Sequence, residues 1–539
     1  MGESRQRGPA RTRHVAGIKR PEPPRSMAAM NVVLFITDQD RAIQHFPPGW
    51  AKRNLPGLTR LQRNGVTFEN AFANACMCTP ARATLMTGYF PAQHGCKYTL
   101  EEDMPEDQYP QVEMPLDLPN LASVFSAAGY QVVYKGKWHL NKPAGSEWAP
   151  SDVGKYGFTR WNPQDAGANQ DIPQAGGGDP DNDHRFMHDD GDMETGHEGA
   201  LPYLRSVAAA QQPFFMVISL VNPHDVLFYP KTYQDAGYDD AWLEGEIELP
   251  ATVDEDLSTK PSVQARFRAL FAATGVLGTK ERQRNYLNFY ANLMKRSDAY
   301  LCEVLDTLEA TGLMENTVVI RTADHGEMGL AHGGLRQKNF NFYEESLRVP
   351  MLFSNPRLYP RPEKADALVS HVDFLPTMAS LFGAPAEARA AWQGVDYARV
   401  VLDPAKARPP QRYVVFTFDD WQAGQASGPY LAPPNHIVSI REERWKLARY
   451  YDAAGEVASQ WEMYDLERDP LERRNLAWPE HRRTPAQEKE FRRLKRRLAV
   501  IQRTRLSPLP TTVESPITQA SSTQGTATTT ATTPAETAG

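Results

Sequence analysis

Four groups of polar residues that could carry chemistry follow directly on short apolar segments rich in β-branched residues. The apolar segments span 31–37, 131–137, 214–220 and 316–322. The carboxyl ends of neighbouring parallel strands meet at one edge of a sheet, so strands formed by these segments would bring the polar groups into a single crevice. We therefore expect an active site built from Asp38-Gln39-Asp40, Lys137-Trp138-His139, Asn222-Pro223-His224-Asp225 and Asp324-His325-Gly326.

Three of these side chains form a donor set for a divalent cation. Asp38 and Asp324 offer carboxylate oxygens and His325 offers an imidazole nitrogen, a combination that suits one Ca²⁺, Mg²⁺ or Mn²⁺ ion. Gln39 could add a carbonyl oxygen, whereas the alternation of side chains along an extended chain directs Asp40 away. The residues predict one metal site, with calcium as the favoured ion.

A structural explanation competes with the metal site. An Asp that follows a strand is often a turn former or a helix cap, and a lone His at a strand end is more often a hydrogen-bonded structural residue than a catalyst. The two carboxylates could also form a buried acid pair that Arg321 or Arg41 neutralises. The convergence of four polar groups on one edge favours the functional interpretation.

The segment 75–82, Ala-Cys-Met-Cys-Thr-Pro-Ala-Arg, is the most specific motif of the chain. It leads into a short helical pattern with Pro80 in the first turn, so Cys78 is expected at the positive end of a helix, where negative charge is favoured. Beside Arg82, such a thiol is expected to have a low pKa and to act as a nucleophile. A zinc site is the alternative, although its C-x-C and H-x-C spacing is unusual for zinc. Its ligands would be Cys76, Cys78, His94 and Cys96.

The elements that must position these residues follow from the apolar pattern. Continuous β-branched runs, including a fifth at 348–354, suit strands buried on both faces. Amphipathic patterns closed by Gly predict helices over 118–130 and 285–312. We predict an α/β fold in which helices sandwich a large, mixed, mostly parallel sheet. From about residue 412 the pattern changes, and residues 412–505 predict a smaller α+β subdomain with an antiparallel sheet and a basic helix.

Composition and charge exclude several classes of protein. The 539-residue chain has a net charge of -7, and its basic residues gather in 1–27 and 480–505, which leaves an acidic body. An acidic body argues against nucleic acid as the main partner. Four cysteines in so long a chain do not form a disulfide scaffold. The sequence contains neither a signal-peptide core nor an apolar run of membrane-spanning length, so we expect a cytoplasmic protein without a membrane partner.

The predicted domain boundaries also follow from composition. Residues 1–27 and the Thr/Ala-rich residues 506–539 contain too few apolar side chains to offset the entropy of ordering, and both are expected to be disordered. Residues 28–411 form the expected catalytic domain, and 412–505 form the subdomain. The Gly- and Asp-rich segment 141–200 is too long for a simple connection, and we expect it to set substrate specificity. The candidate residues there are Trp161, His184 and Arg185.

The motif Cys78-Thr79-Pro80-Ala81-Arg82 fits the pattern C-x-P-x-R. With the following TLMTGYFPAQHG it resembles the signature of the type I sulfatases of the alkaline phosphatase superfamily. The resemblance extends over about residues 30–478 and includes VLFITDQ, YKGKWHL, VNPHD, TADHGE and KNFNFYEESLRVP. It implies that a formylglycine-generating enzyme converts Cys78 to formylglycine (3-oxoalanine), whose hydrate is the nucleophile. It also implies that the substrate is a small-molecule sulfate ester.

The resemblance implies roles at the metal and at the nucleophile. Asp38, Asp324 and His325 match the metal ligands of the family, and an oxygen of the modified Cys78 completes the set. Arg82 matches the residue that holds the formylglycine hydrate. These roles agree with the donor set and the helix-terminal cysteine inferred from the residues themselves.

The resemblance also implies roles at the sulfate and the leaving group. Lys137 and His139 match a pair that contacts the nucleophile and the sulfate, and Lys338 matches a lysine that grips the sulfate oxygens. His224 matches a histidine that assists the leaving group. Attack on a sulfate ester spreads negative charge over the non-bridging oxygens, which cationic side chains stabilise, and the leaving oxygen needs a proton from a general acid.

Two departures from the common family pattern keep alternatives open. Many sulfatases carry Asp-Asp and Asp-Asn where this chain has Asp38-Gln39 and Asp324-His325, and these pairs resemble the branch that holds choline sulfatases and phosphonate monoester hydrolases. The intact Lys137 and His139 are the sulfatase form of a motif that the phosphonate hydrolases replace, which favours an arylsulfatase or choline-sulfatase-like enzyme. A phosphonate or phosphate ester hydrolase is the first alternative. A non-catalytic metal-binding protein with unmodified Cys78 is the second, and its basic helix at 480–505 would dock a partner.

Overall fold

The computed structural model describes most of the chain between residues 26 and 509. Within this span the residues left out are 43–44, 103, 105–106, 108, 168–171, 179–180, 192–196, 391, 423 and 425–429. The predictions of disorder for 1–27 and 506–539 therefore fall almost entirely outside the described residues.

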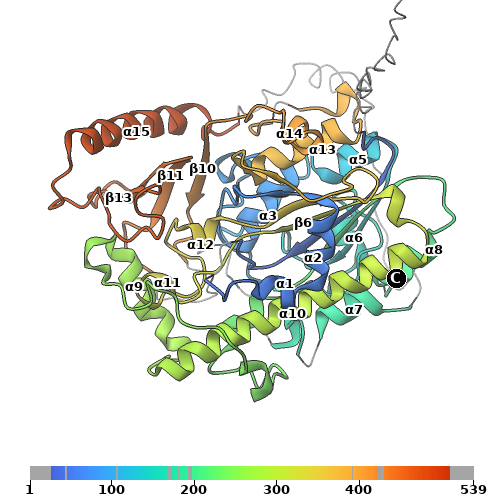
Figure 1. Ribbon diagram of the computed structural model, residues 1–539, viewed down its shortest axis with the longest axis horizontal. Coiled ribbons are helices and arrows are strands. Elements are labelled where there is room, and N and C mark those ends of the chain that lie inside the picture. Colours follow the sequence, from blue (N-terminus) through green and yellow to red (C-terminus); the bar gives the residue numbers. More distant parts are fainter. Residues whose placement is uncertain are drawn as a thin grey trace, which may run out of the picture.

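A seven-stranded sheet forms the centre of the molecule (Figure 1). Its strands are β1 (Asn31–Thr37), β2 (Gly65–Phe68), β4 (Gln131–Gly136), β5 (Phe214–Ser219), β6 (Thr317–Ala323), β7 (Met351–Ser354) and β8 (Glu363–Ala365). They lie in the order β4-β5-β1-β6-β7-β2-β8. The first four are parallel, and β7 runs antiparallel to both of its neighbours. The predicted mixed, mostly parallel sheet is confirmed.

Some of the helices cover the two faces of this sheet, and the others pack elsewhere in the molecule. The helices are α1 (Trp50–Asn54), α2 (Pro56–Arg63), α3 (Cys78–Thr87), α4 (Pro91–His94), α5 (Leu121–Ala127), α6 (Pro150–Gly154), α7 (Asn182–His188), α8 (Ala200–Ser206), α9 (Ser262–Phe271), α10 (Lys280–Ala310), α11 (Ala331–Gly334), α12 (Glu344–Leu347), α13 (Phe374–Leu381), α14 (Ala398–Leu402) and α15 (Pro485–Thr504). Among the described residues, none of these helices is long and apolar enough to cross a bilayer.

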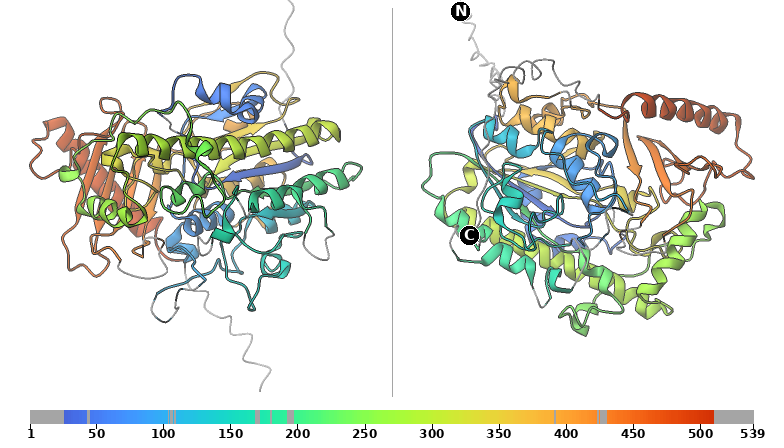
Figure 2. Two further views of the ribbon diagram at one scale, coloured as in Figure 1. Left: turned by 90° about the horizontal axis from the view of Figure 1, so that it is seen from below. Right: turned by 180° about the vertical axis from the view of Figure 1, so that it is seen from behind.

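The side chains of β1 alternate between the two helical layers, as the pleat of a strand requires. Val32, Leu34 and Ile36 belong to the core shared with α3, α5, α13 and α14. Val33 and Phe35 face the other core, which contains residues of α2, α8 and α10. Figure 2 shows α10 running along that face of the sheet. The central strand is thus buried on both sides, which explains its uninterrupted apolar sequence.

Element boundaries differ from the predictions where capping and proline chemistry decide them. The helix predicted at 285–312 begins earlier, because the Thr279 side chain accepts a hydrogen bond from the backbone N–H of Arg282 at 3.2 Å and caps α10. The strand predicted at 348–354 begins only at Met351. The residue before it, Pro350, has no N–H to donate to a sheet ladder.

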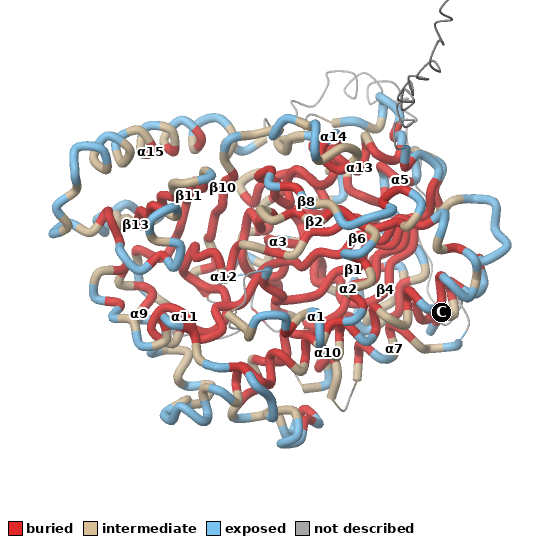
Figure 3. The backbone as a smooth tube through the Cα atoms, in the orientation of Figure 1, coloured by how far each residue is buried: buried red, intermediate tan, exposed pale blue. Residues whose placement is uncertain are grey.

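A second, antiparallel sheet lies at one end of the molecule (Figure 1). It consists of β10 (Tyr413–Phe418), β11 (His436–Glu442), β12 (Trp445–Tyr451) and β13 (Gln460–Asp465). One face packs against the body of the molecule, and the other packs under Leu494, Leu498 and Ile501 of α15. The opposite side of α15 is largely exposed (Figure 3). The predicted antiparallel sheet with a helix is confirmed, while the boundary at residue 412 stays a prediction. The two-residue strands β3 (Ala71–Phe72) and β9 (Val369–Ser370) pair separately.

Candidate active site

The carboxyl ends of β1 and β6 bring two carboxylates side by side. These strands are parallel neighbours in which Thr37 is opposite Ala323, so the next residues, Asp38 and Asp324, leave the sheet at the same level. The backbone N–H of His325 donates to Asp324 Oδ1 at 2.8 Å. All three predicted ligands are completely buried.

Cys78, the first residue of α3, meets these ligands. Its Sγ atom lies 3.7 Å from Asp38 Oδ1 and 3.5 Å from His325 Nε2. The potential ligand atoms of Asp38, Cys78, Asp324 and His325 all lie within 4.8 Å of one another. Two carboxylates and an imidazole fit a divalent cation in their donor chemistry. The structure therefore brings together four of the five predicted metal ligands. The fifth, Gln39, lies beside them, and its backbone N–H donates to Asp324 Oδ1 at 3.1 Å.

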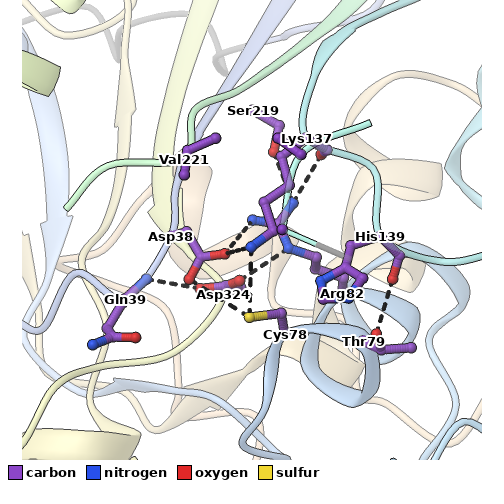
Figure 4. A network of polar contacts seen from close by, with 12 residues as sticks. Asp38, Gln39, Cys78, Thr79, Arg82, Lys137, His139, Ser219, Val221 and Asp324 are labelled. Carbon is purple, nitrogen blue, oxygen red and sulfur yellow. Dashed lines mark hydrogen bonds and ion pairs between the residues drawn. The ribbon is translucent and has the colours of Figure 1, made fainter. Parts of the chain in front are cut away.

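Arg82 braces the two carboxylates from the second turn of α3 (Figure 4). Its Nε atom donates to Asp324 Oδ2 at 2.9 Å, and its Nη2 atom donates to Asp38 Oδ2 at 3.2 Å. Its Nη1 atom donates to Ser219 Oγ at 2.8 Å and to the carbonyl oxygen of Lys137 at 3.0 Å. The guanidinium thus ties the ends of four strands together while it compensates two buried negative charges.

Lys137 leaves the end of β4 and points at the cluster. Its Nζ atom lies 2.5 Å from Asp38 Oδ2 and 3.7 Å from Cys78 Sγ. The approach depends on Gly136, which has φ 100°, because a Cβ atom added there would collide with the backbone of Ser219. Gly136, near the end of the predicted strand, is therefore required for Lys137 to reach this position.

His139 is held from three sides. The backbone N–H groups of Trp138 and His139 donate to the carboxylate of Asp165 at 2.7 and 2.6 Å. The ring Nε2 atom lies 2.8 Å from the carbonyl oxygen of Leu100, and Thr79 Oγ1 donates to the carbonyl oxygen of His139 at 3.0 Å. The residue adopts φ 57°, a conformation that these contacts maintain. Sequence reasoning missed Asp165, whose only signal is an acidic side chain in a Gly-rich loop.

His224 and Lys338 complete the ring of polar side chains. His224 begins a short 3₁₀ helix after β5 and is buried. Burial lowers its pKa to about 4, and the positive charges of Lys137 and Lys338 act in the same direction. Lys338 donates from Nζ to Gln39 Oε1 at 2.7 Å, so the loop after α11 reaches the cluster as well.

The electrostatics of the cluster favour a negative charge at position 78. Burial, the largest influence, raises the pKa of the Cys78 thiol, but the ammonium groups of Lys137 and Lys338 outweigh it, with help from hydrogen bonding by His139 and His224. The pKa of the thiol therefore lies well below its usual value. Burial likewise opposes ionisation of Asp38, and Lys137 is the leading group that nevertheless holds the pKa of that carboxyl below its usual range.

The structural alternatives to this site are not supported. Asp38 and Asp324 contact Arg82, whereas Arg321 pairs with Asp40 at 2.6 Å, away from the cluster. In the part of the chain that the structure describes, three members of the alternative zinc set do not belong to any group of side chains that could hold a metal ion. These three are Cys76, His94 and Cys96.

Of the three specificity residues predicted in segment 141–200, Trp161 and Arg185 instead build the loop, and His184 stays a prediction. Trp161 is completely buried, and its indole N–H donates to the carbonyl oxygen of Gly136 at 2.9 Å. Arg185 donates to the backbone carbonyl oxygen of Pro163 at 2.8 Å, so its charge braces the loop. His184 is exposed and packs on the ring of His188. The composition of the segment does not distinguish side chains that build a loop from side chains that face a substrate.

Comparison with known proteins identifies the family of this chain. A sequence model described as Sulfatase matches residues 30–384, and a model described as N-sulphoglucosamine sulphohydrolase, C-terminal, matches residues 332–503. The Delta 4,5-hexuronate-2-O-sulfatase of Bacteroides thetaiotaomicron is 28% identical over 78% of this chain and 79% of its own length. The choline-sulfatase of Rhizobium meliloti is 26% identical over 83% of this chain and 82% of its own length.

Solved structures share the fold. A 2-O GAG sulfatase covers 88% of this chain and 92% of its own chain with a TM-score of 0.64 and 23% identity. The phosphonate monoester hydrolase of Agrobacterium radiobacter covers 87% of this chain and 95% of its own with a TM-score of 0.61 and 20% identity. Because the family model spans more than half of the sequence, this chain belongs to the sulfatase family and is a sulfuric ester hydrolase.

Proposed function

We propose that this sulfatase works with a formylglycine made from Cys78 and with one divalent cation, calcium being the favoured ion. The observation that carries the proposal is the meeting of Cys78 Sγ with the ligand atoms of Asp38, Asp324 and His325 within 4.8 Å at the N-terminus of α3. A helix N-terminus stabilises negative charge, and the buried donor set suits a hard cation. A formylglycine-generating enzyme is the implied maturation partner.

The formylglycine at position 78 and the divalent cation have separate roles in the proposed reaction. Formylglycine would supply a hydrated aldehyde oxygen as the nucleophile, and a bound cation would supply positive charge that stabilises negatively charged oxygens. Asp38, Asp324 and His325, with Gln39, would hold the cation. Lys137 and Lys338 bind the sulfate oxygens and stabilise the charge that grows on them in the transition state, because both ammonium groups are buried and already oriented.

His224 is the proposed general acid, and it donates the proton that the leaving oxygen needs. Its pKa of about 4 describes the site without substrate, where burial and two lysines disfavour the charged ring. The negative charge of a bound sulfate monoester would act to raise this pKa and so favour the protonated ring. His139 is the proposed proton acceptor for the group at position 78. Its Nε2 atom lies 2.8 Å from the carbonyl oxygen of Leu100 and must donate there, which leaves Nδ1 as the unprotonated, accepting nitrogen of a neutral ring.

Comparison of two substrates tests this function directly. The chain is produced together with a formylglycine-generating enzyme, and kcat/KM is measured for an aryl sulfate and for the matching aryl phosphonate. We expect the sulfate to be turned over faster and the activity to disappear on dialysis against a chelator and to return with the cation. Faster turnover of the phosphonate would overturn the sulfatase assignment in favour of the related hydrolase activity.

We further propose that the physiological substrate is a small sulfate ester and that the enzyme acts in the cytoplasm. The proposal of a small ester rests on the likeness to a choline-sulfatase and a hexuronate sulfatase over most of their lengths. Assay of a panel of choline, sugar and aryl sulfates ranks these classes, and fractionation of the native host tests the compartment.

A further inference from the structure

Glu327 is a buried carboxylate beside the cluster that has no part in the mechanism so far. Its side chain is 0% exposed. Its Oε2 atom accepts a hydrogen bond from Gln39 Nε2 at 2.5 Å. Its Oε1 atom accepts from Tyr286 Oη at 2.7 Å and from the backbone N–H groups of Gly329 and Gln337 at 3.1 and 3.0 Å. An acid with four donors around it is built into the structure.

These contacts decide which way the carboxamide of Gln39 points. A carboxylate can only accept hydrogen bonds, so the NH₂ group of Gln39 must face Glu327. The Oε1 atom of Gln39 therefore faces the other way, where it accepts from Lys338 Nζ at 2.7 Å. In Figure 4 this oxygen lies on the side of Cys78 and the nitrogen lies on the far side. A flipped amide would point NH₂ at the ammonium group and its oxygen at the carboxylate.

The backbone of Gln39 is held by the same helix that holds Glu327. Tyr290 donates from Oη to the carbonyl oxygen of Gln39 at 2.8 Å, and Tyr286, one turn earlier on α10, donates to Glu327. The N–H of Gln39 donates to Asp324 Oδ1 at 3.1 Å. Gln39 has φ 65°, a left-handed conformation that a side chain rarely adopts without such support.

We propose that Glu327 is a positioning residue, which locks the side chain of Gln39 with its oxygen towards the cation so that Gln39 can serve as a ligand. The inference rests on the proposed function, because it requires a cation at the Asp38, Cys78, Asp324 and His325 cluster. Residues that orient metal ligands without touching the metal commonly change affinity by roughly 10- to 100-fold when they are replaced.

The affinity of the chelator-stripped protein for Ca²⁺ and Mn²⁺, measured by titration calorimetry, tests this inference without any assay of activity. Glu327→Gln keeps the size of the side chain but brings an NH₂ group against these donors, and we expect Kd to rise roughly 10- to 100-fold. Glu462→Gln is the matched control. Glu462 is equally buried and accepts hydrogen bonds from Tyr343, Tyr450 and Tyr464, but it lies in the second sheet, and its replacement should leave Kd unchanged.

A double-mutant cycle shows whether Glu327 acts through Gln39. We expect Gln39→Ala to weaken cation binding, and we expect Glu327→Gln in the Gln39→Ala background to weaken it no further. Additive effects would overturn the inference, as would a Glu327→Gln protein that binds the cation as tightly as the parent. If Glu327→Gln does not fold, Glu327→Asp withdraws the carboxylate from Gln39 and carries the same expectation. A parent protein that binds no cation at all would instead contradict the proposed function.

Discussion

Two buried clusters of charged side chains in this molecule look alike but differ in what they can do. The catalytic cluster consists of Asp38, Cys78, Arg82, Lys137, Asp324, His325 and Lys338. The interface cluster lies where the second sheet meets the body of the molecule and consists of Glu255, Lys260, His332, Glu344, Glu345, Arg441, Lys446 and Glu472. Each contains at least three potential ligand atoms within 4.8 Å of one another. Proximity of ligand atoms therefore does not separate a reactive site from a structural one.

The interface cluster is balanced. Lys446 Nζ lies 2.7 Å from Glu472 Oε1 and 3.0 Å from Glu344 Oε1, and His332 Nδ1 lies 2.9 Å from Glu255 Oε2. With His332 protonated, the cluster has as many cationic side chains as carboxylates. Such a network joins two parts of a protein, and it leaves no charge to attract a ligand.

The catalytic cluster has more cationic side chains than carboxylates. With formylglycine, which carries no charge, at position 78, Arg82, Lys137 and Lys338 outnumber Asp38 and Asp324. A bound cation would increase this positive surplus. A sulfate monoester, which carries one negative charge, would offset part of this surplus. The cluster also has a reactive atom at position 78, at the N-terminus of a helix. Surplus charge next to a nucleophile, rather than burial or pairing, is what marks the functional cluster.

Removal of the nucleophile from the catalytic cluster should give the largest effect, which is a loss of activity without a loss of stability. In Cys78→Ala we expect kcat/KM for an aryl sulfate to fall by roughly 10⁴-fold or more, because the covalent route is lost, while the melting temperature changes little. Steady-state kinetics and thermal unfolding measure both quantities. Cys302→Ala, at the half-buried cysteine of α10, is the control and should retain activity. Activity of Cys78→Ala within ten-fold of the parent would refute the role of Cys78.

Removal of the proposed general acid should have a smaller effect that depends on the leaving group. In His224→Asn we expect kcat to fall by roughly 10²- to 10⁴-fold for an alkyl sulfate, whose leaving oxygen needs a proton, and less for an aryl sulfate with an acidic phenol. A series of aryl and alkyl sulfates measures this dependence. An equal loss for all leaving groups would assign His224 to binding.

Removal of a cation from the interface cluster should affect stability and leave the chemistry intact. Lys446→Met leaves Glu472 without its buried cationic partner and leaves Glu344 paired with Arg441 alone. We expect the free energy of unfolding to fall by about 3–5 kcal/mol. Urea unfolding measures this loss. The folded enzyme should keep kcat/KM within a few-fold, and a large loss of activity without a loss of stability would contradict the division between the clusters.

The interface cluster should also make stability depend on pH through His332. Burial opposes protonation of this ring, but the negative charges of Glu345 and Glu255 outweigh burial and raise its pKa to about 9. The folded pKa exceeds the usual 6.5, so the stabilisation is complete below pH 6.5 and is lost as the pH rises through 9. We expect His332→Gln to lower the melting temperature most below pH 6.5 and least above pH 9. If the melting temperatures of the parent and of His332→Gln differed by the same amount at every pH in this range, protonated His332 would not be the source of the stabilisation.

How far the sequence predicts this molecule depends on how local each signal is. The range predicted for β1 agrees with the structure, because seven buried residues in a row carry their own pattern, and the polar residues after each strand meet as parallel topology requires. The sequence pattern predicts the start of α10 too late, because this start depends on the Thr279 cap. It does not predict the burial of Trp161, because this burial depends on a hydrogen bond to the carbonyl oxygen of Gly136. Glu327 could not be recognised, since its partners Tyr286 and Gln39 lie far away in sequence.

The central claim is that the residue at position 78 is not a cysteine in the working enzyme. Mass spectrometry of the peptide that contains this position, taken from protein of known specific activity, tests the claim most directly. We predict that the sulfur is replaced by an aldehyde oxygen in a fraction of molecules that rises in proportion to activity. Fully active protein in which every copy of the peptide carries a free Cys78 thiol would contradict the account.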